Sequence, residues 1–236
     1  MIFKKKEKIT VWSVIPGFEK LTCLEPAKKY IPEWFKKVQQ EKYSDYSNVK
    51  NCPSFPWWFT QGYVLPLWCD LQVFIKNNDV CWSTPLDTFQ FVFHTKDQFE
   101  DYVPKHIKEN ILCIMKPKCP LRVKTPNGWR LQQLPMFYEY NQIFNTLPGI
   151  IPASKLFEIN PQLAFNRDYF TEKNNYSVLI PKGTPLAMYV PIPEKPLELD
   201  IVEQTPELKK LDDLQMLAVN TKFKYRWKDY LKQKLF

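Results

Sequence analysis

One stretch, Tyr63 to Ile75, limits the folds open to this chain more than any other. Its odd-numbered positions are all apolar, while its even positions mix Pro66, Trp68, Asp70 and Gln72. A repeat of two puts successive side chains on opposite faces of a β-strand. The pattern predicts one central strand whose odd residues enter the core, with Asp70 inside that strand.

Short apolar runs separated by turn residues fill most of the remaining chain. The predicted strands are Ile9 to Ile15, Val80 to Trp82, Phe89 to Phe93, Ile111 to Met115, Leu121 to Lys124 and Trp129 to Leu134, followed by proline-punctuated runs up to Pro193. Turn residues at 77–79 and 125–128 separate some of these runs. Short strands between turns predict a mainly β body: a sandwich, a barrel or a β-clip-like fold.

Helical spacing occurs near both ends of the chain. Tyr30, Trp34 and Val38 recur at helical spacing within 26–40, where Pro32 resets the turns. After Pro206, leucines stand at 208, 211, 214 and 217. We therefore expect a short N-terminal helix and a C-terminal helix. The predicted organisation is one β-rich domain over 1–205 and a basic, aromatic helical tail over 206–236 packed on it.

The composition indicates a folded protein of the reducing cytoplasm. Aromatic residues make up 16% of the 236 residues, which is ample surface to bury. No run approaches the roughly 18–20 apolar residues of a membrane span, and the first residues lack the apolar core of a signal peptide. The six cysteines are scattered through a large chain without a secretory signal, which favours free thiols over a disulfide framework.

Several kinds of active site are excluded by what the chain lacks. Its five glycines never fall close enough together for a phosphate-binding loop, a dinucleotide fingerprint or a G-x-S-x-G elbow. With only His94 and His106, three histidines cannot ligate one metal within a subunit. We expect no metal and no cofactor. The remaining catalytic candidates are weak: Asp70, whose burial would raise its pKa, and His94 at a strand end.

The C-terminal tail allows two interpretations. Its cations alternate with aromatic residues at Lys222, Lys224, Arg226, Trp227 and Lys228. Such alternation is typical of single-stranded nucleic-acid platforms. The same residues read as a helix would pack Phe223 and Trp227 on one face and solvate the lysines on the other. The scarcity of arginine in a chain of net charge +8 favours packing, and a protein partner or self-association over nucleic acid.

Three segments of the chain are PAKKYIPEW at 26–34, Cys52-Pro53 leading into GYVLPLWCD at 62–70, and IPKGTPLA at 180–187. Together they resemble a functionally uncharacterised family of proteins found in tailed phages, notably marine ones, and in some bacteria. The resemblance covers roughly residues 9–193. It implies a phage or bacterial origin and supplies no activity.

A second resemblance concerns Gly149 to Pro152 followed by Ile180 to Met188. Their order is similar to two motifs of the dUTPase and dCTP deaminase β-clip fold, a G-x-I-D strand and a G-D-R-I-A-Q strand. Pro152 stands at the position of the catalytic aspartate, and no arginine-serine-glycine phosphate motif is present. The resemblance implies β-clip architecture without that catalytic residue.

Two functions follow from these observations. The first is a non-enzymatic binding or structural protein, which would act through an aromatic surface or by oligomerising. It would be located in the cytoplasm, which for a viral protein is that of the host, or in a virion. The alternative is a β-clip-type nucleotide-binding protein or enzyme. Polar groups converging in a pocket would distinguish the second from the first.

Overall fold

The computed structural model describes residues 7–38, 49, 54–77, 79–85, 89–94, 104–139, 141–171 and 177–220. The chain divides into two compact units, Met1–Lys195 and Pro196–Phe236, each described here by itself. We call the first unit the body.

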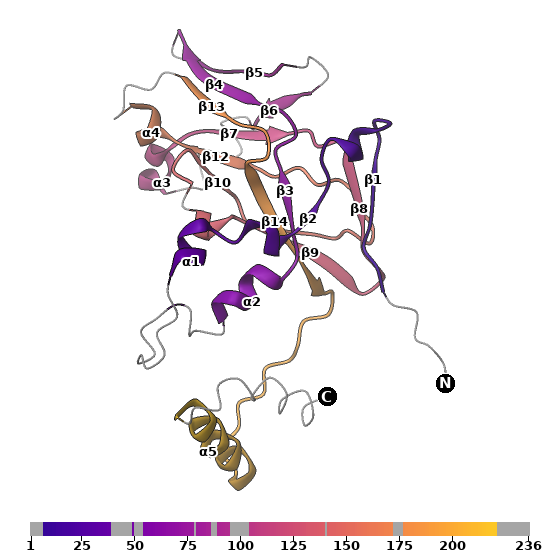
Figure 1. The fold of residues 1–236 in the computed structure, drawn as a ribbon, viewed down its shortest axis with the longest axis vertical. Helices are drawn as coiled ribbons and strands as arrows, with labels where there is room; N and C mark the ends of the chain where they lie inside the picture. Colours follow the sequence, from indigo (N-terminus) through magenta and orange to yellow (C-terminus); the bar gives the residue numbers. More distant parts are fainter. Residues whose placement is uncertain are drawn as a thin grey trace. The chain divides into compact units, whose positions relative to one another are not determined.

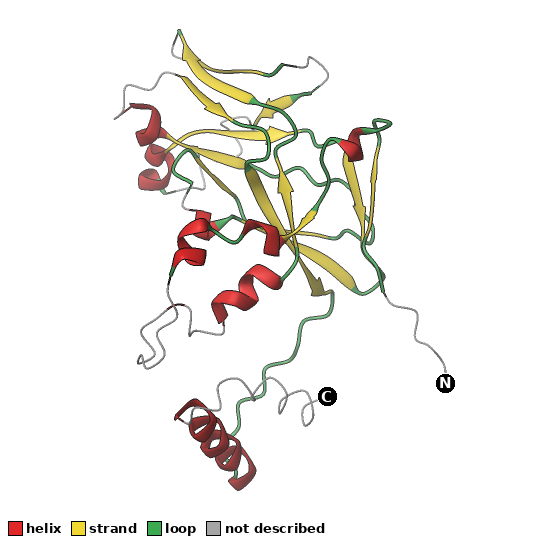
Figure 2. Cartoon of the chain, in the orientation of Figure 1, coloured by secondary structure: helices red, strands yellow, loops and turns green. Residues whose placement is uncertain are grey.

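The body is built mainly from strands (Figures 1 and 2). The strands are β1 (Thr10–Ser13), β2 (Glu25–Pro26), β3 (Tyr63–Pro66), β4 (Leu71–Lys76), β5 (Asp79–Ser83), β6 (Phe91–Phe93), β7 (Ile111–Pro117), β8 (Leu121–Lys124), β9 (Trp129–Leu134), β10 (Phe144–Thr146), β11 (Gly149–Ile151), β12 (Leu163–Asn166), β13 (Ser177–Ile180) and β14 (Pro185–Pro193). Its helices are η1 (Phe18–Lys20), η2 (Ala27–Tyr30), α1 (Glu33–Lys37), α2 (Ser54–Thr60), α3 (Lys105–Asn110), η5 (Phe137–Glu139) and α4 (Arg167–Thr171).

The strands form four sheets in which every pairing is antiparallel. The sheet orders are β1-β8, β10-β12-β7-β6, β11-β9-β14-β3-β2 and β13-β4-β5. Each of these sheets has two edge strands, so the described strands form no closed barrel. The predicted mainly β fold with a short N-terminal helix is confirmed.

Two apolar clusters hold the body together. The larger lies among all four sheets and includes Leu67, Leu71, Leu121 and Phe165, each no more than 1% exposed. The smaller lies on the opposite face of β3 and β14, where Ala27, Val64 and Met188 pack together. Burying both faces of β3 explains why Val64 is as inaccessible as its neighbour Leu65.

The stretch 63–75 is not the single strand that its alternation predicts. It forms β3 and β4, which belong to different sheets, with a bend at 67–70. Pro66 lies opposite Pro185 of β14, and neither proline can donate a ladder hydrogen bond. The odd residues from Leu65 to Val73 are buried as predicted, but Tyr63 is exposed.

The helical predictions agree with the structure at both ends. The segment 26–40 contains η2 and α1, and Pro32 directly precedes α1. In the second unit, α5 spans Pro206–Asn220. Leu208 and Leu211 of α5 are exposed. The packing of the tail on the body stays a prediction.

Candidate functional site

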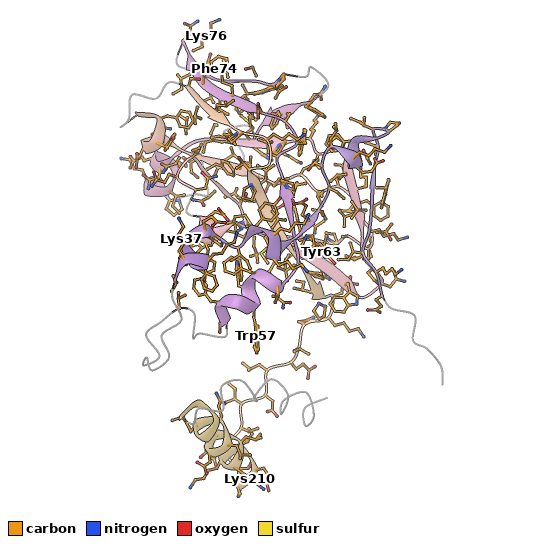
Figure 3. All side chains as sticks on the ribbon, in the orientation of Figure 1. Lys37, Trp57, Tyr63, Phe74, Lys76 and Lys210 are labelled. Carbon is orange, nitrogen blue, oxygen red and sulfur yellow. The ribbon has the colours of Figure 1, made fainter. Side chains whose placement is uncertain are left out.

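A groove of about 510 Å³ opens on the surface of the body. We call it the Trp129 groove, and it is lined by Glu7, Lys8, Ile9, Tyr63, Thr125, Pro126, Trp129 and Pro191. These residues come from the segment before β1, the first residue of β3, the connection from β8 to β9, and β14. Tyr63, labelled in Figure 3, is the residue at which β3 begins.

One hydrogen bond fixes the indole of Trp129 in this groove. Trp129 is the first residue of β9 and lies opposite Pro193 of β14. Its Nε1 donates to Oε2 of Glu7 at 2.9 Å, across 122 positions of sequence. The bond orients the ring and ties the segment before β1 to the five-stranded sheet. The groove is therefore formed by tertiary contact between distant segments.

The connection from β8 to β9 is the predicted turn at 125–128, but it joins no hairpin. Thr125 is 1% exposed and donates from Oγ1 to the carbonyl oxygen of Trp129 at 2.9 Å. Gly128 has φ +83°, a conformation that glycine adopts without strain. Beyond the turn, β8 pairs with β1 whereas β9 pairs with β11 and β14. Because the two strands enter different sheets, the groove opens beside their connection.

The chemistry of the groove suits binding better than catalysis. Its walls are mainly Tyr63, Trp129 and two prolines. The Glu7 carboxylate already accepts the Trp129 hydrogen bond, and the Thr125 hydroxyl already donates one. Catalysis by proton transfer or nucleophilic attack needs two groups positioned toward each other. The lining residues offer no such pair, although they offer flat apolar surface beside the Lys8 ammonium.

The buried thiols are equally unsuited to nucleophilic chemistry. Desolvation by burial raises the pKa of Cys69 to about 11 and the pKa values of Cys113 and Cys119 to about 12. The reactive form of cysteine is the thiolate. These three side chains are therefore protonated at neutral pH and act as apolar core residues.

Asp70 lies at a bend between β3 and β4, exposed, and the prediction of a carboxylate within a strand is wrong. Its Oδ1 accepts the backbone N–H of Lys182 at 2.7 Å. The neighbouring backbone also pairs, because Leu67 donates to Thr184 and accepts from Gly183. Asp70 thus fastens two connections together, which is a structural role. A catalytic role for Asp70 stays untested.

His94 directly follows β6, which agrees with its predicted position at the end of a strand. Its backbone N–H donates to the carbonyl oxygen of Ile114 at 2.9 Å. Asp70 and His94 do not line the Trp129 groove. Among the described side chains, no group of three or more His, Cys, Asp and Glu is placed to hold a metal ion.

The nucleic-acid candidates in the tail lie outside the described residues. They are Lys222, Lys224, Arg226, Trp227 and Lys228. The two interpretations of that segment therefore both stand as predictions. Across the part of the chain that is described, no helix is long and apolar enough to cross a membrane.

The two segments that resemble β-clip motifs lie on either side of β9 in one sheet. Gly149 to Ile151 forms β11, and the second segment ends in the first part of β14, from Pro185 to Met188. The turn leading into β14 has no free amide for a phosphate. The N–H groups of Lys182, Gly183 and Thr184 donate to Asp70, Leu67 and Pro181 respectively.

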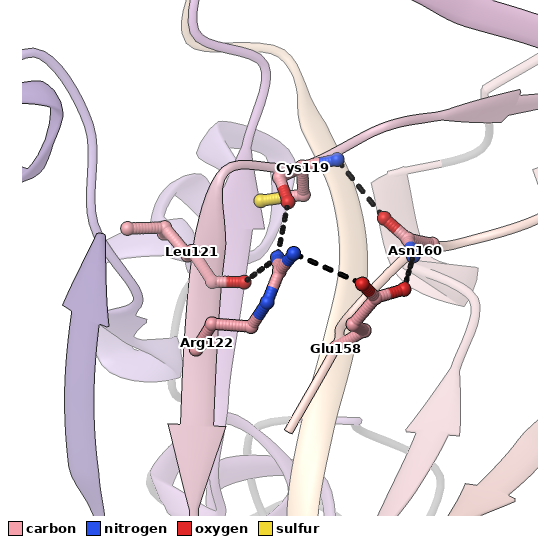
Figure 4. Close-up of polar contacts among 5 residues, drawn as sticks. All are labelled: Cys119, Leu121, Arg122, Glu158 and Asn160. Carbon is pink, nitrogen blue, oxygen red and sulfur yellow. Dashed lines mark hydrogen bonds and ion pairs between the residues drawn. The ribbon is translucent and has the colours of Figure 1, made fainter. Parts of the chain in front are cut away.

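A cluster of polar side chains surrounds Arg122 on β8 (Figure 4). Its guanidinium donates to the carbonyl oxygens of Cys119 and Leu121 and pairs with Glu158 at 2.9 Å. Asn160 donates to Glu158 and accepts the backbone N–H of Cys119. Every dashed contact in Figure 4 joins one protein group to another. The cluster fastens the segment 158–160 to β8 and offers nothing to a ligand.

Replacing Arg122 by Met is expected to destabilise the body by about 1–3 kcal/mol. The change leaves two backbone carbonyls and the Glu158 carboxylate without their charged donor, and unpaired polar groups cost roughly that much. Thermal or urea unfolding measures the loss. Lys155→Met is the matched control, since Lys155 is exposed and has no described side-chain hydrogen bond. Equal stability of the two variants would contradict this assignment.

Comparison with known proteins places the chain in no family. No family model matches it, and no curated protein sequence matches it. Solved structures similar to it include an EIAV dUTPase, at 7% identity and TM-score 0.34 over 84% of this chain and 98% of that one. The dUTPase of Staphylococcus bacteriophage 80alpha with dUpNHpp is similar at 11% identity and TM-score 0.37, over 85% and 91%. A dUTPase from phage phi11 of S. aureus is similar at 10% identity and TM-score 0.37, over 84% and 99%.

These likenesses are too weak to assign an activity to this chain. The resemblance to the uncharacterised phage family likewise stays a prediction, because no family model supports it. The groove was not predicted from the sequence either. Trp129 was recognised only as the start of a strand, and Tyr63 was expected to be buried although it is 36% exposed.

Proposed function

We propose that this protein acts by binding another polypeptide, and that the Trp129 groove takes an extended stretch of that polypeptide. The observation that carries the proposal is the lining itself: Tyr63, Trp129, Pro126 and Pro191 around a volume of about 510 Å³. Aromatic-lined grooves bind extended, proline-containing segments because such segments lose little conformational entropy on docking. Lys8 at the groove would favour an acidic residue in the bound segment.

The lack of a catalytic pair in the groove supports the same proposal. The Glu7 carboxylate and the Thr125 hydroxyl are both engaged in hydrogen bonds that shape the groove. An enzyme site of this size would be expected to aim unengaged polar groups at its substrate. Binding of a polypeptide needs only apolar contact, a few polar groups and a charge at the rim.

Panning a random library of linear peptides against the intact protein tests this function. We expect recovered peptides to bind wild type and to lose at least about tenfold in affinity, or about 1.4 kcal/mol, with Trp129→Ala. Tyr63→Ala should weaken them as well, since Tyr63 lines the same groove.

Trp57→Ala is the matched control, because Trp57 is 51% exposed on α2 and does not line the groove. The melting temperature of each variant shows that lost binding is not lost folding. Peptides that bind wild type and both groove variants equally would contradict the proposal, as would a failure to select any binder.

A second candidate function is nucleotide binding by a β-clip-type protein. It is favoured by the placement of the two similar segments on either side of β9 in one sheet. A thermal-shift titration with dUTP and dCTP, with and without Mg²⁺, tests it, because a ligand that binds only the native state raises the melting temperature. The polypeptide-binding proposal expects no shift, and a saturable rise would favour the nucleotide.

A further inference from the structure

The segment 196–203, which we call the arm, exposes apolar side chains in an alternating pattern. Leu197, Leu199 and Ile201 are 95%, 85% and 84% exposed. Glu198 and Asp200 lie between them. A repeat of two is the pattern of a strand with one apolar face. Among the described residues of the second unit, no backbone hydrogen bond joins the arm to another segment of that unit. The arm thus has the side-chain alternation of a β-strand but no described backbone pairing with another strand.

The strand β1 has an edge with unpaired backbone groups. Val123 of β8 lies opposite Val11 but donates its N–H away from β1, to Phe157 at 2.8 Å. Val14, beyond the end of β1, donates toward the β8 side, to Pro120 at 3.0 Å. Because paired and unpaired residues alternate along an antiparallel ladder, Val11 and Ser13 direct their backbone groups to the side opposite β8. Among the described strands, none neighbours β1 on that side.

The side chains around this edge would accept another apolar strand. Val11 and Ile9 pack against the main core yet are only half-buried. Trp12 is 37% exposed, and Val14 and Ile15 beyond the strand are 55% and 38% exposed. The outer edges of β11 and β13 each present a single exposed apolar side chain, Ile150 and Leu179. The edge of β1 therefore offers the largest exposed apolar surface of the three.

The charges on the arm and at β1 are complementary. The arm carries Glu198, Asp200 and Glu203 and no lysine or arginine. Lys8 precedes β1, and Lys124 lies opposite Thr10, both exposed and without a carboxylate at ion-pair distance among the described residues. The nearby acids are engaged, because Glu7 accepts from Trp129 and Glu158 pairs with Arg122. Opposite charges fix the register of a strand added to an edge.

We propose that the arm of one copy of this chain adds as a strand to the open edge of β1 in a second copy. The backbone of Val11 and Ser13 would pair with the arm, and Leu199 and Ile201 would cover the half-buried side of Val11. Glu198 and Asp200 would then lie on the face of β1 that carries Lys124. This surface borders the polypeptide-binding groove, whose lining includes Lys8 and Ile9 but neither Val11 nor Ser13. The partner is the protein itself.

Two single variants test the arm and the edge independently. Val11→Pro removes an N–H that points to the open edge and leaves the β8 ladder intact, whereas Val11→Ala keeps that N–H. Leu199→Asp alters only an exposed arm residue. Light scattering after size exclusion should show wild type and Val11→Ala as oligomers, with Val11→Pro and Leu199→Asp shifted to monomer or at least about tenfold weaker.

A mixture of the two defective variants provides the sharper result. Val11→Pro retains an intact arm and Leu199→Asp retains an intact edge, so the mixture can form one arm-to-edge junction that neither variant forms alone. We expect a complex in the mixture, detected with one variant fluorescently labelled. Because this complex needs Val11→Pro only as an arm donor, it is informative even if that substitution lowers the stability of the body.

Three outcomes would overturn the inference: a monomeric wild type, unchanged association of Leu199→Asp, or no complex in the mixture. None of them bears on the groove, because peptide binding is measured through Trp129 and Tyr63. If the protein is monomeric and selected peptides bind its groove, the arm-to-edge proposal is wrong and the proposed function stands. If the protein is oligomeric through the arm and binds no peptide, the proposed function is wrong and the arm-to-edge proposal stands.

Discussion

Replacing Leu67 by Asp is expected to abolish the folded body. Leu67 is 1% exposed in the main core, at the bend between β3 and β4. An uncompensated buried charge costs about 3–5 kcal/mol, and the loss of apolar contacts adds to it. Total stabilities of domains are only roughly 5–15 kcal/mol. Soluble expression and circular dichroism measure the outcome.

Leu156→Asp is the control for that substitution, because Leu156 is 63% exposed and lies outside the arm. The same chemical change there should leave the melting temperature of the body unaltered. A soluble Leu67→Asp protein that melts with wild type would show that the bend at 67–70 does not lie in the core.

Gly62→Ala is expected to lower the free energy of unfolding by about 2–4 kcal/mol. A Cβ at Gly62 would lie 2.2 Å from the carbonyl oxygen of Tyr189, which belongs to the central strand β14. The backbone there has φ +69°, a conformation that costs alanine energy, and overpacking against a strand adds about 1–3 kcal/mol. Urea unfolding would measure the loss.

Gly183→Ala separates the two causes of that loss. Gly183 has φ +88°, but a Cβ there would meet nothing within 4 Å. It should therefore show only the conformational cost, about 1–2 kcal/mol. If both variants lost equal stability, the close approach of Gly62 to β14 would have no energetic consequence.

The strands and helices follow from local pattern more closely than the sheets do. The apolar runs at 111–115, 121–124 and 129–134 are the positions of β7, β8 and β9. The leucine spacing after Pro206 is that of α5. The error at 63–75 arose because the buried alternation continues through the bend. The division into β3 and β4 shows only in their pairing with strands of two different sheets.

The candidate site was less accessible to prediction than the fold. The sequence points to Asp70 and His94 through their places in predicted strands, and the structure gives Asp70 a backbone contact between two connections. The Trp129 groove depends on the hydrogen bond between Glu7 and Trp129, which are 122 positions apart in sequence. No local motif marks the groove, because its lining comes from short segments that are separated by long stretches of chain.

The sequence by itself determined that this chain folds into short strands with a helix near each end, and that it has no phosphate-binding glycine loop. The periodicity of apolar residues and the positions of turn residues depend on only a few neighbouring positions. They therefore predict secondary structure without knowledge of the tertiary structure. Only the tertiary structure decided which strands share a sheet, that Tyr63 and Trp129 line one groove, and that β1 has an open edge among the described strands. Those features depend on pairing between segments that are distant in sequence. Many strand registers are compatible with the same local pattern, and the packing of the whole core selects one of them.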